Sequence, residues 1–271
     1  MPRQLTIVLI GLALYWPLTR AWSDEAVSET VVTATFADRS ISALATHFER
    51  HQQFKRAIVL MPGHPGIMKI QSAGTFQLKG NFLIRSRKLW LDQDTIVFSV
   101  DAPSDEWQGF TGGFRASGRY TEDIKGLVLE IGKRFGPLPL VIVGTSEGSV
   151  SAYHAARALG QANVKVIFTS SLFNNSKNSP GLASLDFDDF KIPILWVHHV
   201  ADPCQWTPYW QAKRYADKTR SPLITVKSSD QGRGDPCAAF SPHGYIGVEA
   251  ETVLAMKNWV INGEVKDVVV P

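Results

Sequence analysis

The chain has 271 residues, 44% of them hydrophobic, and its 28 Lys and Arg against 25 Asp and Glu give a formal net charge of +3. This length and hydrophobic content are sufficient for one well-cored domain of α/β size. The near balance of charge, with no basic run, argues against a nucleic-acid partner. No internal repeat or low-complexity linker divides the chain.

The first 23 residues have the pattern of a secretory signal peptide. Arg3 supplies the positive end, the run from Leu5 to Tyr15 is almost wholly apolar, and Ala21-Trp22-Ser23 offers small residues for cleavage. An uncleaved membrane anchor is the alternative, although the apolar run is short for a membrane span. We therefore expect an exported protein, periplasmic or extracellular, with one mature domain over residues 24–271 and no stable membrane association after cleavage.

Strand-like apolar runs alternate with helical segments along the mature chain. Buried strands separated by helices imply a mostly parallel central sheet with helices on both faces, an α/β fold. In such sheets functional groups gather at the carboxyl ends of the strands. The expected strands are Thr30–Phe36 (an edge strand), Ala57–Met61, Thr95–Val100, Leu140–Val143, Val164–Phe168, Pro193–Val197 and Leu223–Val226, and the expected helices are Leu78–Trp90, Thr121–Phe135, Val150–Leu159 and Glu249–Ile261.

Between one of these strands and the next helix lies Gly144-Thr145-Ser146-Glu147-Gly148. A Gly-x-Ser-x-Gly in this position predicts a nucleophile elbow, in which the serine lies on a sharp strand-to-helix turn. The residues two before and two after the serine must be small, because larger side chains would collide with the neighbouring strand and helix, and Gly144 and Gly148 meet that demand. An ordinary glycine-rich turn is the alternative.

A serine nucleophile needs a base beside its hydroxyl and an acid that orients the base. His243, in the loop between the last expected strand and the last helix, suits the base, and Asp202, just after another strand, suits the acid, in the chain order serine, acid, histidine. Asp235 is a second candidate acid, with a local sequence like that of Asp202, but it is close to His243 in the chain. His47 and His51 lie in a polar segment, and we expect both to be solvated.

A metal site is an alternative use of some of the same residues. His198 and His199 end an expected strand, and with Asp202 and His243 they would offer imidazole and carboxylate ligands. No HExxH or paired CxxC spacing supports this interpretation. We therefore expect no metal and no cofactor.

The turn Met61-Pro62-Gly63-His64-Pro65-Gly66 follows the first buried strand. An oxyanion hole needs two backbone N–H groups aimed at the developing charge. One is expected from Glu147, the residue after the nucleophile, and the other from this turn, with His64 as the first choice and Gly63 as the second. A plain tight turn is the alternative.

With these residues assembled, the chain resembles the α/β-hydrolase superfamily over about residues 55–265. It is most similar to small secreted bacterial serine hydrolases. Many members carry a cap domain between the strands that here end near Phe168 and begin near Pro193, but only about 24 residues lie between them. That is too few for a separate lid domain. The resemblance therefore implies an α/β-hydrolase fold with no large lid and an open or shallow cleft.

The function that this resemblance implies is hydrolysis of a small-molecule carboxylic ester through an acyl-enzyme on Ser146. A peptidase or amidase with the same triad is one alternative, and a hydrolase-like binding protein without turnover is another.

Trp107 and Phe110 follow a strand end, where they either contact the substrate or cover the edge of the sheet. The sequence leaves the oligomeric state and the acyl-chain length open.

Cys204 and Cys237 are the only two cysteines. Export would place them in an oxidising compartment, where two thiols have one possible pairing. Each lies close to a proposed catalytic residue, and in the assumed fold those two loops must meet. We expect a disulfide that holds the Asp202 loop against the His243 loop, with two free buried thiols as the alternative.

Overall fold

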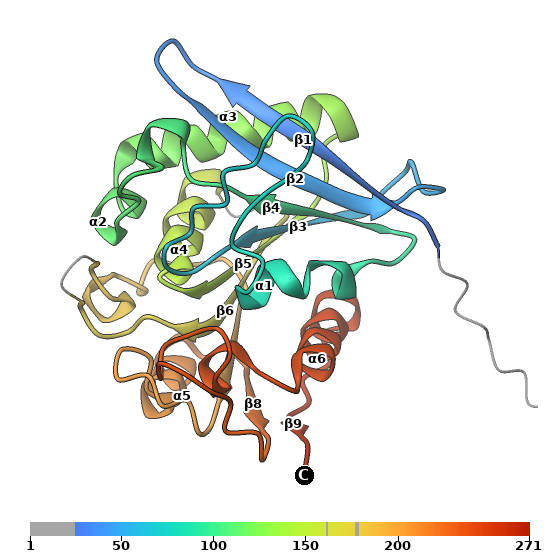
Figure 1. The fold of residues 1–271 in the computed structure, drawn as a ribbon. Coiled ribbons are helices and arrows are strands. Elements are labelled where there is room, and N and C mark those ends of the chain that lie inside the picture. Colours follow the sequence, from blue (N-terminus) through green and yellow to red (C-terminus); the bar gives the residue numbers. More distant parts are fainter. Residues whose placement is uncertain (1–24, 161, 177–178) are drawn as a thin grey trace, which may run out of the picture.

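The computed structural model describes residues 25–160, 162–176 and 179–271. The expected signal peptide lies outside these residues. Within them, nine strands form one sheet in the order β1-β2-β4-β3-β5-β6-β7-β8-β9 (Figure 1). The strands are β1 (Val27–Thr35), β2 (Ser40–Phe48), β3 (Arg56–Met61), β4 (Thr95–Val100), β5 (Leu140–Ser146), β6 (Val164–Ser171), β7 (Ile194–His199), β8 (Leu223–Lys227) and β9 (Val268–Val269).

The sheet is mostly parallel, as the alternation of strands and helices predicts. The pairs from β4 through β3 and β5 to β9 are parallel, and only the β1–β2 and β2–β4 pairs are antiparallel. Every residue of β4 and of β7 is buried, which explains why both strands are mostly apolar in the sequence, apart from Thr95 and Ser99 in β4 and the two histidines that end β7. The edge strand expected over Thr30–Phe36 is β1.

Helices cover both faces of this sheet. Residues of α3, α4 and α5 pack with one face, and residues of α1 and α6 pack with the other (Figure 1). The α-helices are α1 (Phe82–Arg85), α2 (Gly112–Arg115), α3 (Gly118–Phe135), α4 (Gly148–Leu159), α5 (Tyr209–Thr219) and α6 (Glu249–Asn262), and the 3-10 turns are η1 (Arg87–Trp90), η2 (Ser104–Glu106), η3 (Leu182–Ser184) and η4 (Pro242–Gly244).

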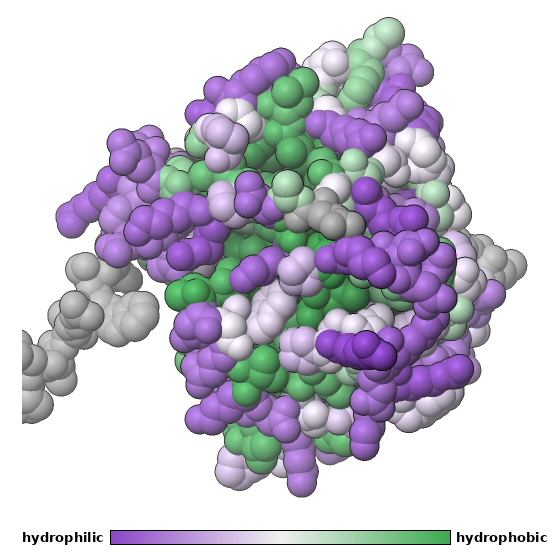
Figure 2. Space-filling view, turned by 180° about the vertical axis from the view of Figure 1, so that it is seen from behind, coloured by the Kyte–Doolittle hydropathy of each residue, from purple (hydrophilic) through white to green (hydrophobic). Residues whose placement is uncertain are grey.

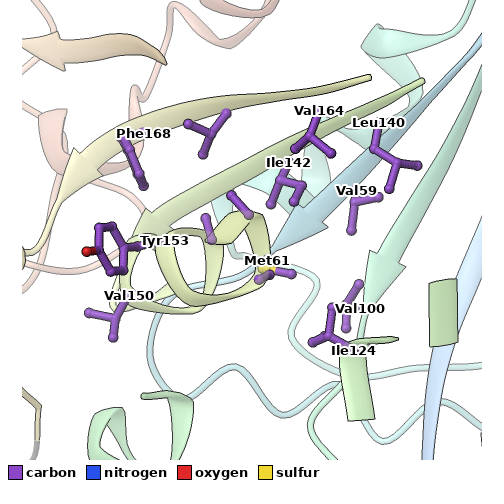
Figure 3. Packing of buried hydrophobic residues seen from close by; sticks show 14 of the residues in the cluster. Val59, Met61, Val100, Ile124, Leu140, Ile142, Val150, Tyr153, Val164 and Phe168 are labelled. Atoms are coloured by element: carbon purple, nitrogen blue, oxygen red, sulfur yellow. The ribbon is translucent and has the colours of Figure 1, made fainter. Parts of the chain in front are cut away.

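The core on the α3–α4 face holds the central strands in place. Figure 3 shows side chains of β3, β4, β5 and β6 meeting those of α3 and α4. Along β5 the side chains alternate: Ile142 belongs to this core, whereas Val141 and Val143 belong to the core on the α6 side. Burial of each Val or Ile side chain stabilises the folded state by about 1.5–3 kcal/mol. Because such side chains lie on both faces of β5, the strand is held in place from both sides, and Ser146 is its last residue.

Two expectations from the sequence are wrong in this part of the chain. Leu78–Trp90 is not one helix, because Leu78 has a φ of +61° and Asn81 caps α1 by accepting a hydrogen bond from the N–H of Leu83. The helix then ends at Arg85, with Ser86 as its C-cap, before η1. His47 is not solvated: it lies in β2 with 5% of its surface exposed, and its Nδ1 is 2.8 Å from the carbonyl oxygen of Phe48. That hydrogen bond offsets the cost of burying the imidazole.

The connection between β6 and β7 has no large lid. In its described residues the only regular element is the 3-10 turn η3. No helix in the described part of the chain is long and apolar enough to cross a membrane. Seen from behind, hydrophilic residues cover much of the molecule, and apolar residues lie between them (Figure 2).

Candidate active site

Ser146 lies where β5 turns sharply into α4. Its φ is +52°, in the left-handed region that a residue with a side chain rarely adopts. The structure holds this strained conformation by close packing on both sides. A Cβ on Gly148 would lie 2.0 Å from the carbonyl oxygen of Met61, and one on Gly144 would lie 2.4 Å from that of Gly148. Both positions therefore demand glycine, for the steric reason that the sequence motif suggested.

His243 and Asp202 meet on the other side of the site. Nδ1 of His243, in η4, is 3.0 Å from Oδ2 of Asp202, in the loop after β7. The Asp202 side chain is fully buried and that of His243 is 6% exposed. The second carboxylate oxygen of Asp202 accepts a hydrogen bond from the N–H of Cys204. Because Nδ1 is engaged, Nε2 of His243 is the nitrogen left to exchange a proton.

Thr207 contacts both members of this pair, and no sequence motif predicts that it does. Its Oγ1 donates to Oδ2 of Asp202 at 2.8 Å and lies 3.1 Å from Nδ1 of His243. The residue is completely buried. A threonine five positions after an aspartate carries no local signal of such a role, because the contact depends on how the loop folds back over its own start.

Asp235, the second candidate acid, lines the pocket described below but makes no hydrogen bond with His243. It is exposed, and its Oδ1 accepts a hydrogen bond from the N–H of Cys237. Asp202 makes the same contact with the N–H of Cys204. The Asp-Pro-Cys sequence thus builds the same Asx turn twice, which explains the resemblance between the two segments. Only the Asp202 turn brings its carboxylate to His243.

A disulfide joins Cys204 to Cys237, so the loop after β7 is covalently tied to the loop that leads to His243. The Cα atoms of the two cysteines are 4.6 Å apart. Both cysteines line the pocket described below. The predicted pairing is therefore present in the structure.

The turn after β3 packs directly on the serine. A Cβ on Gly63 would lie 2.9 Å from Cβ of Ser146 and 3.6 Å from its Oγ. Among the described residues, the N–H groups of Gly63, His64 and Glu147 have no acceptor in a turn, a loop or a side chain. These three groups are thus available to a ligand beside Ser146.

Charged side chains lie behind these N–H groups. Burial opposes ionisation of Glu147, but the nearby imidazole of His64, 3.5 Å from Oε2, and the charge of Arg115 outweigh it, so the pKa of Glu147 is lowered. The same contact with Glu147 raises the pKa of His64. Burial lowers the pKa of Arg115 from its ordinary value.

A pocket of about 530 Å³ opens above Ser146 and His243. Trp107 and Phe110 are not part of its lining. Trp107 donates through Nε1 to the carbonyl oxygen of Ala102, and Phe110 is buried against Tyr120, so both support the core. The pocket is lined by Gly63, His64, Asn81, Phe82, Thr145, Ser146, Glu147, Leu172, Ser176, Cys204, Trp206, Asp235, Cys237, Ala238, Ala239, His243 and Gly244.

The histidines of the alternative metal site have other partners. His198 is completely buried, its Nε2 accepts from the N–H of Ser171, and burial lowers its pKa to about 3. Nε2 of His199 is 3.0 Å from Oγ of Ser228. In the residues that the structure describes, no three His, Cys, Asp or Glu side chains are grouped to hold a metal ion.

Comparison by sequence finds no protein-family model and no curated protein that matches this chain. Comparison of structures does find similar folds. An esterase described as cold-adapted, from an Arctic intertidal metagenomic library, has a TM-score of 0.57 at 10% identity, with 86% of this chain and 94% of that one covered. An α/β serine hydrolase without lid from Xanthomonas campestris has a TM-score of 0.55 at 13% identity, over 87% and 93% of the two chains.

Est1E from Butyrivibrio proteoclasticus has a TM-score of 0.57 at 12% identity, with 86% of this chain and 98% of that one covered. At such low identity these similarities define the fold. The chain has the α/β-hydrolase fold, without a large lid between β6 and β7. The expected fold class is confirmed.

Proposed function

We propose that the protein is an exported serine hydrolase that cleaves carboxylic esters of small molecules. The observation that carries this proposal is the pocket itself, in which Ser146, on a strained elbow, shares a lining with His243, and His243 is hydrogen-bonded to the buried Asp202. Serine, histidine and acid in these relations are the parts of a hydrolytic triad. The disulfide supports export, because such bonds persist in oxidising compartments.

The chemistry follows from the roles of these groups. Oγ of Ser146 attacks the ester carbonyl while Nε2 of His243 takes its proton, and Asp202 holds the imidazole in the required tautomer. The N–H groups of Glu147 and His64, with Gly63 as the second choice in the turn, stabilise the negative oxygen. His243 then protonates the leaving alcohol, and an acyl-enzyme remains on Ser146. Water attacks this ester by the same steps, releases the acid and restores the serine.

We favour esters over amides as the substrate class for two reasons. One of the structurally similar proteins is described as an esterase. The pocket is open, and the connection that carries a lid domain in many α/β-hydrolases is short in this chain. Hydrolysis of a panel of esters of increasing acyl-chain length, with the matching amides alongside, would define the preference.

Labelling with a fluorophosphonate probe tests the core of the proposal. The probe should label the wild type and should not label Ser146→Ala. Ser176→Ala is a matched control, because it removes another hydroxyl from the lining of the same pocket. Equal labelling of the wild type and Ser146→Ala would contradict the proposal.

N-terminal sequencing tests export. The mature chain should begin near Asp24, and secreted protein that begins at Met1 would contradict the proposed signal peptide.

A further inference from the structure

Arg115, the last residue of α2, is a charged side chain buried behind the candidate site. Only 1% of its surface is exposed. Burying a guanidinium is unfavourable by several kcal/mol unless its N–H groups and its charge find partners. The identity of these partners therefore shows what the residue is used for.

Two of the partners are carbonyl oxygens of the turn after β3. Nη1 of Arg115 donates to the oxygen of Pro62 at 3.2 Å, and Nη2 donates to that of Pro65 at 3.5 Å. These two carbonyl groups flank Gly63 and His64. The guanidinium thus holds the turn on both sides of the N–H groups of Gly63 and His64.

The remaining partners tie Arg115 to the start of α4. Nη1 also donates to Oγ of Ser151 at 3.0 Å. Nε lies 3.8 Å from Oε2 of Glu147, too far for a hydrogen bond, so these two groups interact through their charges. Nδ1 of His64 lies 3.5 Å from the same oxygen. The Glu147 carboxylate therefore lies between the arginine and the turn.

The packing around the guanidinium leaves little room for the turn to move. Its central carbon lies 4.0 Å from the centroid of the Phe110 ring. A Cβ on Gly66, which has a φ of +71°, would lie 2.1 Å from Nη2. The planar guanidinium group is thus enclosed between an aromatic ring and the backbone of the turn, an arrangement that a lysine cannot reproduce.

We propose that Arg115 is a positioning residue that fixes the two backbone donors of the oxyanion hole relative to each other. This inference rests on the proposed function. One donor belongs to Glu147 and the other to the Gly63–His64 turn, and these segments are 83 residues apart when measured from His64 to Glu147. Arg115 contacts both. Donors fixed in advance stabilise the transition state without reorganising when the charge develops.

The test compares Arg115→Lys and Arg115→Met with wild type, using a soluble short-chain ester. Loosened donors should lower kcat by about 10- to 100-fold, while KM changes by less than about two-fold, because the donors act on the transition state more than on the bound substrate. A trifluoromethyl ketone, which forms a tetrahedral oxyanion adduct with the serine, should lose affinity by the same factor as kcat/KM. A role in folding alone would not produce this parallel loss.

Arg119→Met is the matched control, because Arg119 is partly exposed and pairs with Asp105 away from the site. It should keep the wild-type kcat. Thermal unfolding shows which variants are folded, and if Arg115→Met is not, Arg115→Lys decides. Folded Arg115 variants with the kcat and inhibitor affinity of Arg119→Met would overturn the inference. A wild type that neither reacts with the probe nor hydrolyses any ester would instead contradict the proposed function.

Discussion

The serine half of the candidate site and its acid–base half are held in place by different means. The serine half consists of β5, α4 and the turn after β3, and its geometry is set by backbone atoms in contact, with glycines where no Cβ fits. The acid–base half consists of the loop after β7 and the loop after β8. Side-chain hydrogen bonds and one disulfide hold these loops together.

Because the two halves are held by different contacts, amino-acid substitutions should affect them differently. A close-packed backbone tolerates no added atom at the contact. Two loops tolerate changes of shape, but they depend on a few specific groups. Substitutions of the glycines at the backbone contacts of the serine half should therefore affect stability first, and substitutions in the acid–base half should affect turnover first.

The largest effect is expected at Asp202. Asp202→Asn keeps the size of the side chain but removes the charge that holds the imidazole tautomer, and kcat should fall by about 10⁴-fold with the fold intact. Asp235→Asn is the control, since Asp235 forms the same Asx turn but does not contact His243. Ester hydrolysis measured for both variants decides between the two acids. Loss of activity in Asp235→Asn alone would move the role to Asp235.

In the serine half, Gly148→Ala should destabilise the protein by more than about 4 kcal/mol, because the added Cβ would meet the Met61 carbonyl at 2.0 Å. Gly132→Ala is its counterpart on the solvent side of α3, where an added Cβ meets nothing within 4 Å. It should stabilise the protein by about 0.5–1 kcal/mol. Urea denaturation measures both. Similar unfolding free energies for the two variants would mean that the elbow is not sterically closed.

Removal of the disulfide tests the acid–base half. With a sequence separation of 33 between the cysteines, replacing both by alanine should reduce the unfolding free energy by about 3–4 kcal/mol in the chain-entropy model. Reduction should also lower activity before the domain unfolds, because the two loops lose their covalent tie. Parallel measurements of ester hydrolysis and tryptophan fluorescence during reduction separate the two events. Full activity after complete reduction would show that the hydrogen bonds suffice.

The smallest effect is expected at Thr207. Thr207→Val removes one buried hydrogen bond to Asp202 and should lower kcat by about 10-fold, which corresponds to about 1.4 kcal/mol. Thr207→Ser keeps the hydroxyl and should restore most of the activity. If Thr207→Val keeps the wild-type kcat while Thr207→Ser loses activity, the methyl group and its packing matter and the hydroxyl does not.

The two halves also differ in how far the sequence predicts them. The elbow was predictable because the two glycines of a Gly-x-Ser-x-Gly between strand and helix lie at positions where a larger side chain would collide with the backbone. Asp202 and His243 followed from chain order, and Cys204–Cys237 from the absence of any other cysteine. Thr207 and Arg115 carried no signal, because their contacts arise only when the loop after β7 folds back and when α2 packs under the turn. In the same way β2 was missed, since its small and polar residues hide a buried strand.

The disulfide also closes a covalent ring, and that ring contains the most exposed stretch near the site. Residues 229–236 are exposed, and they lie between Cys204 and Cys237. A protease that cut this stretch would leave two fragments joined through sulfur. The segment that carries His243 would then stay attached to the segment that carries Asp202. Nicked protein would migrate as one band without reductant and as two bands with it, and a cut in this stretch would not separate Asp202 from His243.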